Sequence, residues 1–298
     1  MLRAQGHSVR IDETYGGAPC DLMIAIHAWR SAGSISAYRA KHPKGPLIVT
    51  LAGTDVNTFL KTEPKTTLAS MYAADALICL HGLIKDDLPD DLHSKLYLVH
   101  QSAKPLPTAR RPRTHTFGVC VIGHLREEKD PFRTARAARL VPAQSRLRVH
   151  HLGKALTNAW AREAKREMTQ NPRYIWNGEV AAWQVRREFA KTHAMVISSN
   201  QEGGANVVSE AIVAGVPIIA SDIPGNVGLL GAVYPGYYPV RDEQALADIL
   251  WRAESEPKFL ASLQRHVDKL RPKFTPEAEA KSLAGVIRSA AKAILTSG

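Results

Sequence analysis

Residues 193–221 read HAMVISSNQEGGANVVSEAIVAGVPIIAS and combine two apolar runs with a pair of glycines. The apolar runs HAMVISS and GVPIIAS do not alternate polar with apolar residues, which is typical of strands that are covered on both faces. Between them, two glycines lead into a helix that we predict to begin near Asn206 and to end at Gly215. A strand, a glycine turn, a helix and a second strand form one unit of a parallel α/β sheet.

The same alternation of apolar runs and amphipathic stretches extends along the rest of the chain. It predicts an α/β fold with two doubly wound, Rossmann-like domains in series. The other predicted strands are 21–27, 46–53, 75–82 and 95–101 in the first half, and 117–123, 147–153 and 173–178 in the second.

A proline-rich segment separates the two halves. Residues 101–116 carry three prolines and show no strand or helix period, so we interpret them as a linker. The predicted domains are an N-terminal, acceptor-side domain at 1–112, a nucleotide-sugar-binding domain at 113–275, and an amphipathic helix at 276–298. The opening residues LRAQGHSVRI predict the end of a helix, a glycine stop and an edge strand, so the first domain is expected to lack its first strand.

Composition limits the class of protein. The chain has 298 residues, of which 45% are hydrophobic and 22% charged, and these values exclude a disordered chain and suggest about two globular domains. No apolar stretch approaches the roughly 18 residues of a membrane span, and the first residues lack a signal-peptide core. We therefore expect a cytoplasmic protein without a membrane partner. The three cysteines share no metal-ligand spacing and are predicted to be reduced thiols.

The chain is basic, with 39 Lys and Arg against 28 Asp and Glu, a net charge of +11. Clustered basic residues would favour nucleic acid, but here only residues 104–113 are dense in charge, and no recognition motif accompanies them. We expect no nucleic-acid partner, because modest basicity also suits an enzyme whose substrates are small polyanions.

The loop after the strand at 117–123 is the first candidate site. It reads Gly123-His124-Leu125-Arg126-Glu127-Glu128-Lys129-Asp130-Pro131. Pro131 suits the first turn of a helix, since its missing N–H is not needed there. A strand, a glycine turn and a helix start with two cations, Arg126 and Lys129, predict a phosphate cradle.

The loop after the strand at 193–199 is the stronger candidate. Gly203 and Gly204 allow close approach of a ligand, and the helix that starts at Asn206 favours a diphosphate at its amino end. Glu202 precedes this helix and Glu210 lies in its second turn. Both carboxylates can accept hydrogen bonds from sugar hydroxyls.

In the first domain, polar residues follow each predicted strand at the edge where parallel sheets bind ligands. Arg30 is the best single candidate to bind an oxyanion, because its planar guanidinium matches that geometry. Asp55 is a candidate base. The other predicted ligand contacts of this domain are His27, Ser31, Gly53, Thr54 and His81.

Glu202 to Glu210 resembles the E-x7-E motif of retaining glycosyltransferases of family 4, which use nucleotide sugars and have the GT-B architecture. The tail EAIVAGVPIIASDIPGN and the stretch GHLREEKDP resemble two further signatures of that family. One position departs from the family: its phosphate-binding arginine corresponds to His124. The resemblance covers most of the chain and implies two Rossmann-like domains that face a cleft.

The resemblance also implies roles for residues. Lys129, with Arg126, would bind the diphosphate, Glu210 the ribose and Glu202 the transferred sugar, while the amides of Asn206 and Val207 would hold the departing phosphate. Arg30 and His27 would act on the acceptor side. Such enzymes need neither a metal nor a cofactor beyond the UDP-sugar co-substrate, because the lysine, the helix dipole and the amides stabilise the charge that develops on UDP.

A closer resemblance is to the selenosugar synthases of selenoneine biosynthesis, a small branch of the same family. It is carried by HAWRSAGSISAYRAKHP, LAGTDVN, GHLREEKDP, SDIPGNVGLLG and YPGYYPV. It implies transfer from UDP-N-acetylglucosamine to selenophosphate, with retention at the sugar and release of UDP and phosphate.

Other functions remain open at this point. One is a transferase with a hydroxyl acceptor such as a lipid or a glycan. Another is a non-catalytic protein that binds nucleotide sugars, phosphate or, weakly, nucleic acid. A UDP-sugar 2-epimerase shares the architecture, but the segments of the second domain match transferases better.

Overall fold

The computed structural model describes residues 1–295, and these divide into two compact units. Unit 1 consists of residues 1–102 together with the C-terminal segment that begins at Pro276, and unit 2 is Ala103–Thr275. The domains predicted from the sequence, 1–112, 113–275 and 276–298, differ from these units in two respects. Most of the proline-rich segment belongs to unit 2, and the terminal helix belongs to unit 1. The last three positions of the third predicted segment lie outside the described residues.

Unit 1 contains a parallel sheet of four strands in the order β1-β2-β3-β4. All four lie where apolar runs predict them. The strands are β1 (Met23–Ile26), β2 (Leu47–Thr50), β3 (Ala76–Cys79) and β4 (Leu96–Leu98). The helices of this unit are α1 (Ala32–Lys41), α2 (Leu60–Thr62), α3 (Pro64–Ala73) and α11 (Pro276–Leu295), with a π-helical turn η2 (Asp55–Phe59) and 3-10 turns η1 (Leu2–Gln5), η3 (Gly82–Asp87) and η4 (Asp90–Lys95).

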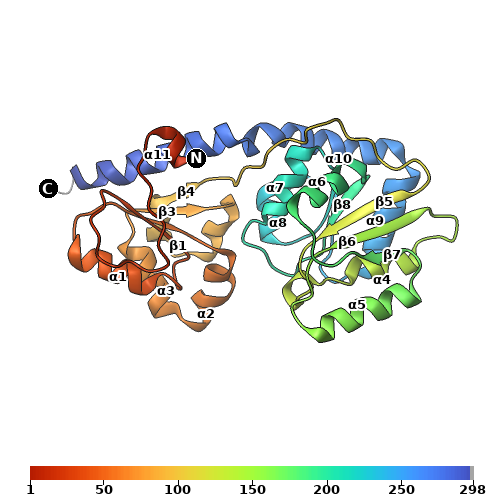
Figure 1. Ribbon diagram of the computed structural model, residues 1–298, viewed down its shortest axis with the longest axis horizontal. Helices are drawn as coiled ribbons and strands as arrows, with labels where there is room; N and C mark the ends of the chain where they lie inside the picture. The colour runs from red at the N-terminus through yellow and green to blue at the C-terminus, as the bar shows by residue number, and fades with distance from the viewer. Residues whose placement is uncertain (296–298) are drawn as a thin grey trace. The chain divides into compact units, whose positions relative to one another are not determined.

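The two faces of this sheet are covered by helices from opposite ends of the sequence. Leu47 and Val49 point into a cluster that includes Ile35 of α1 and Met71 of α3. Ile48, between them, joins a second cluster with residues of α11. In Figure 1 the blue helix α11 accordingly lies on the face opposite α1 and α3. The continuous apolar runs therefore reflect burial on both faces.

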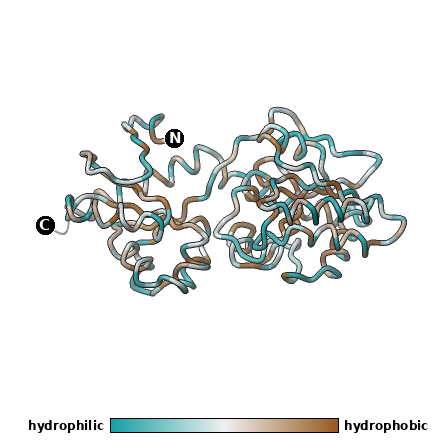
Figure 2. Tube along the Cα trace, turned by 60° about the horizontal axis from the view of Figure 1, so that its bottom comes forward, coloured by the Kyte–Doolittle hydropathy of each residue, from teal (hydrophilic) through white to brown (hydrophobic). Residues whose placement is uncertain are grey.

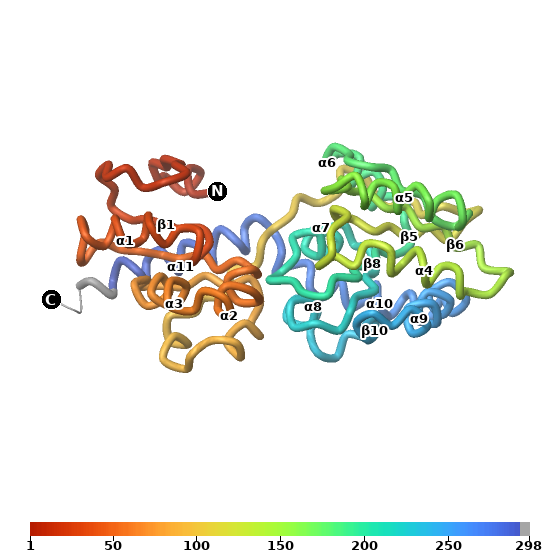
Figure 3. The backbone as a smooth tube through the Cα atoms, turned by 90° about the horizontal axis from the view of Figure 1, so that it is seen from below, coloured from red at the N-terminus to blue at the C-terminus, as the bar shows by residue number. Residues whose placement is uncertain are grey.

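The edge strand predicted near the start of the chain is wrong. Gly6 ends the short turn η1 with a left-handed φ of 89°, as a glycine stop should, but residues 7–22 form no strand. Ile11 is 83% exposed. The segment has too few apolar side chains to bury one face, and it lies as an irregular loop beside α1 (Figure 3), where the Tyr15 hydroxyl bonds the His42 ring at 2.9 Å.

Unit 2 is a doubly wound sheet of six parallel strands in the order β10-β9-β8-β5-β6-β7. The order reverses between β5 and β8, so α4 and α5 cover one face and α6 and α7 the other (Figure 1). Ligands bind such sheets beyond the carboxyl ends of the strands at this switch point. The strands are β5 (Phe117–Ile122), β6 (Leu147–Leu152), β7 (Tyr174–Trp176), β8 (Ala194–Ile197), β9 (Ile218–Ser221) and β10 (Tyr237–Tyr238). The helices are α4 (Arg133–Leu140), α5 (Asn158–Gln170), α6 (Ala182–Lys191), α7 (Asn206–Ala214), α8 (Pro224–Leu230), α9 (Glu243–Ser255) and α10 (Pro257–Leu270), with the 3-10 turns η5 (Glu127–Lys129) and η6 (Arg271–Phe274).

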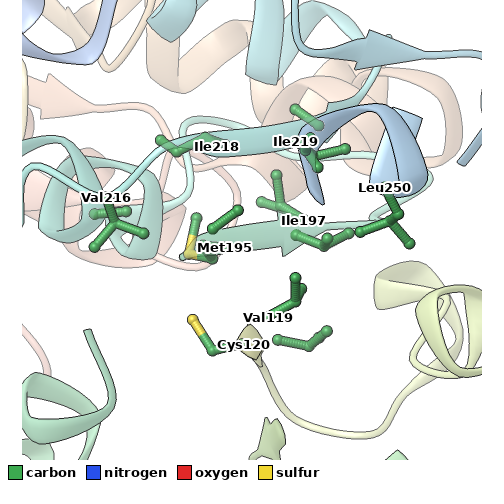
Figure 4. Close-up of a cluster of buried hydrophobic side chains, with 14 of the residues drawn as sticks. Val119, Cys120, Met195, Ile197, Val216, Ile218, Ile219 and Leu250 are labelled. Carbon is green, nitrogen blue, oxygen red and sulfur yellow. The ribbon is translucent and has the colours of Figure 1, made fainter. Parts of the chain in front are cut away.

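The core of unit 2 lies between the central strands and their helices. Figure 4 shows Val119 and Cys120 of β5 near Met195 and Ile197 of β8, and Figure 2 shows hydrophobic residues gathered inside the unit. Cys120 is fully buried, and burial raises the pKa of its thiol, as expected for an inert cysteine. Within the described chain, no helix combines the length and apolarity needed to cross a bilayer.

The proline-rich segment is docked on unit 2. The guanidinium of Arg110 donates to the carbonyls of Thr192 and Phe189, at 2.7 and 3.3 Å, and to Gln264 at 3.0 Å. Burial lowers the pKa of Arg110 to about 10. The linker interpretation is therefore correct about its lack of regular structure, but these bonds hold it against the unit.

Candidate functional site

The switch point of unit 2 brings the two candidate loops together. The hydroxyl of Ser198, directly after β8, donates to the carbonyls of Lys129 and Asp130, at 3.1 and 3.0 Å. The amide of Asn200 donates to the carbonyl of Glu128 at 2.8 Å. The loop after β5 is therefore fixed to the loop after β8 by hydrogen bonds that its backbone carbonyls accept.

Two predicted residues pair at this junction. The ammonium group of Lys129 donates to Oε1 of Glu202, and the hydroxyl of Ser199 donates to the same oxygen at 2.5 Å. The side chains of Lys129 and Glu202 are 21% and 10% exposed. A cation and a carboxylate that are 73 positions apart in the sequence are thus joined at the carboxyl edge of the sheet.

A glycine of α8 supports Glu202 from behind. A Cβ atom at Gly225 would lie 2.3 Å from the carbonyl oxygen of Glu202 and 2.8 Å from its Cβ atom, so only glycine fits there without a shift. The neighbouring Asn226 bonds the carbonyl of Ser221 at 2.9 Å and holds the start of α8 to β9. Gly225 is not among the residues that the sequence predicts for this site, although the stretch DIPGN that contains it carries part of the family resemblance.

The amino end of α7 lies directly after Glu202. Its cap residue, Ala205, offers no side-chain oxygen, and the first amides of a helix have no partner within the helix, so those of Asn206 and Val207 suit an anion. The side chain of Asn206 donates to Glu210 at 2.9 Å. Burial raises the pKa of Glu210, while Arg186 and Asn206 oppose the rise.

Two glycines lie in the loop between β8 and α7. Gly204 has a φ of 110°, which an L side chain rarely adopts, and it permits the turn into α7. Gly203 lies beside it in the loop. The predicted helix start at Asn206 and end at Gly215, where φ is 68°, are both confirmed.

The loop after β5 departs from its prediction at the helix start. Helix α4 begins at Arg133, and Pro131 lies two positions earlier, because Asp130 adopts a left-handed φ of 43° that interrupts the chain before the helix. Nε of Arg126 lies 3.2 Å from a carboxylate oxygen of Glu128.

His124 stands where the family carries its arginine. It is exposed, and its Nδ1 accepts a hydrogen bond from the amide of Lys154 at 3.1 Å.

A buried network holds this loop from below. Nε2 of His151 donates to the carbonyl of Gly123 at 3.0 Å, and its Nδ1 accepts from the hydroxyl of Tyr174 at 2.9 Å. A Cβ atom at Gly153 would lie 1.8 Å from the carbonyl oxygen of Gly123, so glycine is required there. Burial lowers the pKa of His151 to about 4. This neutral histidine fixes the exit of β5.

In unit 1, His27, Thr54 and Asp55 form a second cluster at the carboxyl ends of β1 and β2. Nδ1 of His27 lies 2.6 Å from Oδ1 of Asp55, and Nε2 lies 2.8 Å from Oγ1 of Thr54. His27 has a left-handed φ of 78°, which is uncommon for a residue other than glycine. The ring of Trp29 stacks on Phe59 beside it, with 4.0 Å between centroids.

Asp55 is wrong as a base that contacts an acceptor. Its side chain is fully buried and accepts the amides of Ala28, Trp29 and Ala52, each at 2.9 Å. A carboxylate enclosed in this way cannot reach a substrate. It ties the loop after β1 to the loop after β2.

The remaining predicted residues of unit 1 differ in accessibility. Arg30 and Thr54 are exposed, and Gly53 is half-buried between β2 and Thr54. The hydroxyl of Ser31 donates to the carbonyl of Ile26 at 2.7 Å. His81 is 3% exposed, and burial lowers its pKa, so its predicted contact with a ligand would require the loop after β3 to open.

Other parts of the described chain offer weaker sites. Two hollows of about 340 Å³ in unit 2 are lined by residues other than those predicted to bind the donor, and both combine arginine with glutamate. Among the described residues, no three His, Cys, Asp or Glu side chains gather closely enough to hold a metal ion. Trp183 is 57% exposed on α6.

Comparison with known proteins finds a family that matches the second half of the chain. The sequence profile of the family "Glycosyl transferases group 1" matches residues 109–269. A Bacillus subtilis protein assigned to teichuronic acid biosynthesis, the glycosyltransferase TuaC, is 24% identical over 255 residues, which are 78% of this chain. The chain spans 61% of the length of that relative.

Solved structures match over most of both units. HepE from Anabaena, in complex with UDP and glucose, has a TM-score of 0.73 and 15% identity, over 90% of this chain and 78% of its own. The pneumococcal O-GlcNAc transferase GtfA, in complex with UDP and GlcNAc, has a TM-score of 0.67 and 16% identity, over 89% and 56%. Sucrose-phosphate synthase from Thermosynechococcus elongatus has a TM-score of 0.74 and 18% identity, over 92% and 74%. These neighbours confirm the predicted GT-B fold class.

Proposed function

The chain belongs to the glycosyl transferases group 1 family, and on this premise we propose that it transfers a sugar from a uridine-diphosphate sugar with retention at the anomeric carbon. The observation that carries the proposal is the pairing of Lys129 with Glu202 just before the amino end of α7. An ammonium group and helix amides suit a diphosphate, and a carboxylate suits sugar hydroxyls. Two structural neighbours bind UDP and a sugar, which supports this choice of donor.

In this proposal, the residues of unit 2 divide the donor among them. The positive end of α7 and the Lys129 ammonium stabilise the charge on the departing UDP, so the chain's own groups can supply the electrostatic assistance. Because Glu202 pairs with Lys129 in the structure, it exchanges this partner for a sugar hydroxyl when UDP-sugar binds. Lys129 and Arg126 bind the diphosphate, with His124 beside them, and the amides of Asn206 and Val207 hold the leaving phosphate. Glu210 binds the ribose and Glu202 the transferred sugar. Gly203 and Gly204 allow the ligand to approach the backbone closely.

The acceptor is of one of two kinds. The first is a hydroxyl compound, whose oxygen bonds to the anomeric carbon while UDP leaves and one proton is released. The second, supported by the resemblance to selenosugar synthases and by exposed Arg30 beside Ser31, is selenophosphate with UDP-N-acetylglucosamine as donor. Selenium would bond to the anomeric carbon as UDP leaves, and water would then cleave the selenium–phosphorus bond to release phosphate.

Mass spectrometry of the products tests the proposal and separates the two acceptors. The protein is mixed with UDP-N-acetylglucosamine or UDP-glucose, and with selenophosphate, thiophosphate, a panel of glycosides or buffer alone. A seleno-N-acetylhexosamine formed with one equivalent of UDP would support the narrower proposal, and a glycosylated alcohol the broader one. Failure of the chain to bind UDP or either UDP-sugar would overturn both.

A further inference from the structure

Unit 1 contains a chain of hydrogen bonds that runs from a buried carboxylate to an exposed hydroxyl. Asp55 is fully buried, the side chain of His27 is 9% exposed, and Thr54 is exposed. The imidazole joins the other two groups, with Nδ1 2.6 Å from Asp55 and Nε2 2.8 Å from Thr54. The three residues thus connect the interior of the unit to its surface at the carboxyl edge of the sheet.

The direction of these hydrogen bonds follows from the donors around Asp55. Three backbone amides donate to its carboxylate, which in its ionised form can only accept hydrogen bonds. Nδ1 of His27, at 2.6 Å, must therefore carry the ring proton. The amide of Arg30 lies farther from Nδ1, at 3.3 Å, and cannot donate to a nitrogen that is itself protonated.

The other end of the imidazole is then an acceptor. Burial and the nearby Arg30 charge lower the pKa of His27, and their effect exceeds that of Asp55, which raises it. A ring that is neutral at pH 7 and protonated at Nδ1 has a lone pair at Nε2. The hydroxyl proton of Thr54 must point inward to meet it, so the oxygen of Thr54 presents only lone pairs to solvent.

We infer that Asp55 is a positioning residue that fixes the tautomer of His27, and that Thr54 consequently accepts hydrogen bonds from a hydroxyl-bearing acceptor and disfavours an oxyanion. The inference rests on the proposed function and specifies the class of acceptor on unit 1. The strained backbone of His27 fits this role, because the Asp55 contact and the edge of the Phe59 ring, 5.5 Å between centroids, hold the imidazole in place.

Replacement of Asp55 by asparagine should reverse the direction of the hydrogen bonds that His27 makes with residue 55 and with Thr54. An asparagine can keep the two bonds from the amides of Ala28 and Ala52 on one oxygen only if its NH₂ group takes the place of Oδ1. There it loses the bond from the Trp29 amide and donates to Nδ1 of His27. The ring proton then moves to Nε2, donates to Thr54 and frees the threonine proton to point outward. Asp55→Asn should therefore favour an oxyanion over a neutral hydroxyl compound.

Two NMR measurements on the full chain test the inference. Long-range ¹H–¹⁵N spectra should show His27 protonated at Nδ1 in the wild type and in Thr54→Val, and at Nε2 in Asp55→Asn. Perturbation of the backbone amide signal of Gly53, a neighbour that every variant keeps, by methyl α-glucoside and by thiophosphate then gives a binding preference, which should shift at least tenfold toward thiophosphate in Asp55→Asn. Thr54→Val should lose the preference.

Asp75→Asn is the matched control. Asp75 also holds a backbone amide, that of Leu47 at 2.8 Å, and pairs with Arg39, but it precedes β3 at the opposite edge of the sheet. This variant should keep the tautomer and the preference of the wild type even if it lowers stability. Protonation at Nε2 in the wild type, or an unchanged preference in Asp55→Asn, would overturn the inference. If Asp55→Asn does not fold, the wild-type tautomer and the Thr54→Val titration decide it. Titration with UDP separately reports whether the proposed function fails.

Discussion

Lys129 and Glu202 neutralise each other in the structure, so a diphosphate that binds as we propose must compete with Glu202 for the ammonium group. Both side chains are largely buried, and a charge that loses its partner in such surroundings is costly. We therefore expect a bound diphosphate and sugar to replace both halves of the pair together. The sequence predicts both residues but not their contact, because the pair depends on the crossover that places β8 beside β5.

Glu202→Gln should separate transfer from donor binding. Glutamine keeps the shape of the side chain but removes the charge that stabilises Lys129 and accepts from sugar hydroxyls. We expect the transfer rate to fall about ten- to a hundredfold, since a charged hydrogen bond contributes about 1.5–3 kcal/mol. Affinity for UDP should not fall, because Lys129 is then free for the diphosphate.

Initial rates of UDP release and a UDP titration give the two quantities. Glu163→Gln is the matched control, since Glu163 pairs with Arg166 on the surface of α5 and should leave both unchanged. Loss of UDP affinity in Glu202→Gln, with transfer retained, would assign Glu202 to the nucleotide instead of the sugar.

At the scale of elements, helix starts and strand exits carry the site. The strands of both sheets except β10 were predictable, because runs such as FGVCVIG are apolar without alternation and are buried on both faces. The two-residue strand β10 was not, because Tyr237 and Tyr238 pair with β9 only through the tertiary fold. The buried Asp55 was not predictable either, since its amide partners come from two loops.

Gly225→Ala tests how closely α8 must approach the loop of Glu202. The added methyl group would lie 2.3 Å from the carbonyl oxygen of Glu202, so the loop must move. We expect a loss of about 1–3 kcal/mol in stability and a rise in the KM for UDP-sugar. Gly285→Ala on α11 meets open space and should be neutral or stabilising. Thermal unfolding and steady-state kinetics check both variants, and an unchanged KM in Gly225→Ala would contradict the close packing.

The hydrogen bonds of His151 at the end of β5 predict that the stability of unit 2 depends on pH. The pKa of His151 is about 4 in the folded chain and about 6.5 when unfolded, so between these values the unfolded state binds the additional proton. Stability is therefore lost as the pH falls from 6.5 to 4, by about 3 kcal/mol for this residue.

Denaturant unfolding across this pH range checks the effect. His151→Gln should remove that part of the pH dependence, while His115→Gln, at an exposed position of the same unit, should keep the wild-type slope. The same slope in wild type and His151→Gln would show that His151 does not titrate as described.

At the scale of the whole molecule, the terminal helix α11 completes unit 1. Val286 and Ala290 are buried against Ile48 and Ile78 on the face of the sheet that α1 and α3 leave open. The apolar face of this helix was predictable from the sequence, but its partner was not, because no local pattern relates it to strands more than 180 positions away.

Val286→Ala should therefore destabilise unit 1. Removal of two buried carbons costs about 1–3 kcal/mol, including the cavity they leave. Hydrogen exchange should rise in β2 and β3 and not in β5 or β8. Val233→Ala, at a position 85% exposed in unit 2, is the control and should change neither the stability nor the hydrogen exchange of these strands. Faster exchange confined to unit 2 in Val286→Ala would contradict the placement of the helix.

Calorimetric titration with UDP tests whether unit 2 binds a UDP-sugar through Lys129, as we propose. The wild type should bind one UDP per chain, and Lys129→Met should bind it about ten- to a hundredfold more weakly, as the loss of a charged hydrogen bond predicts. Arg166→Met, which removes a surface cation from α5, should bind like the wild type. Equal affinity of Lys129→Met and the wild type for UDP would contradict the account.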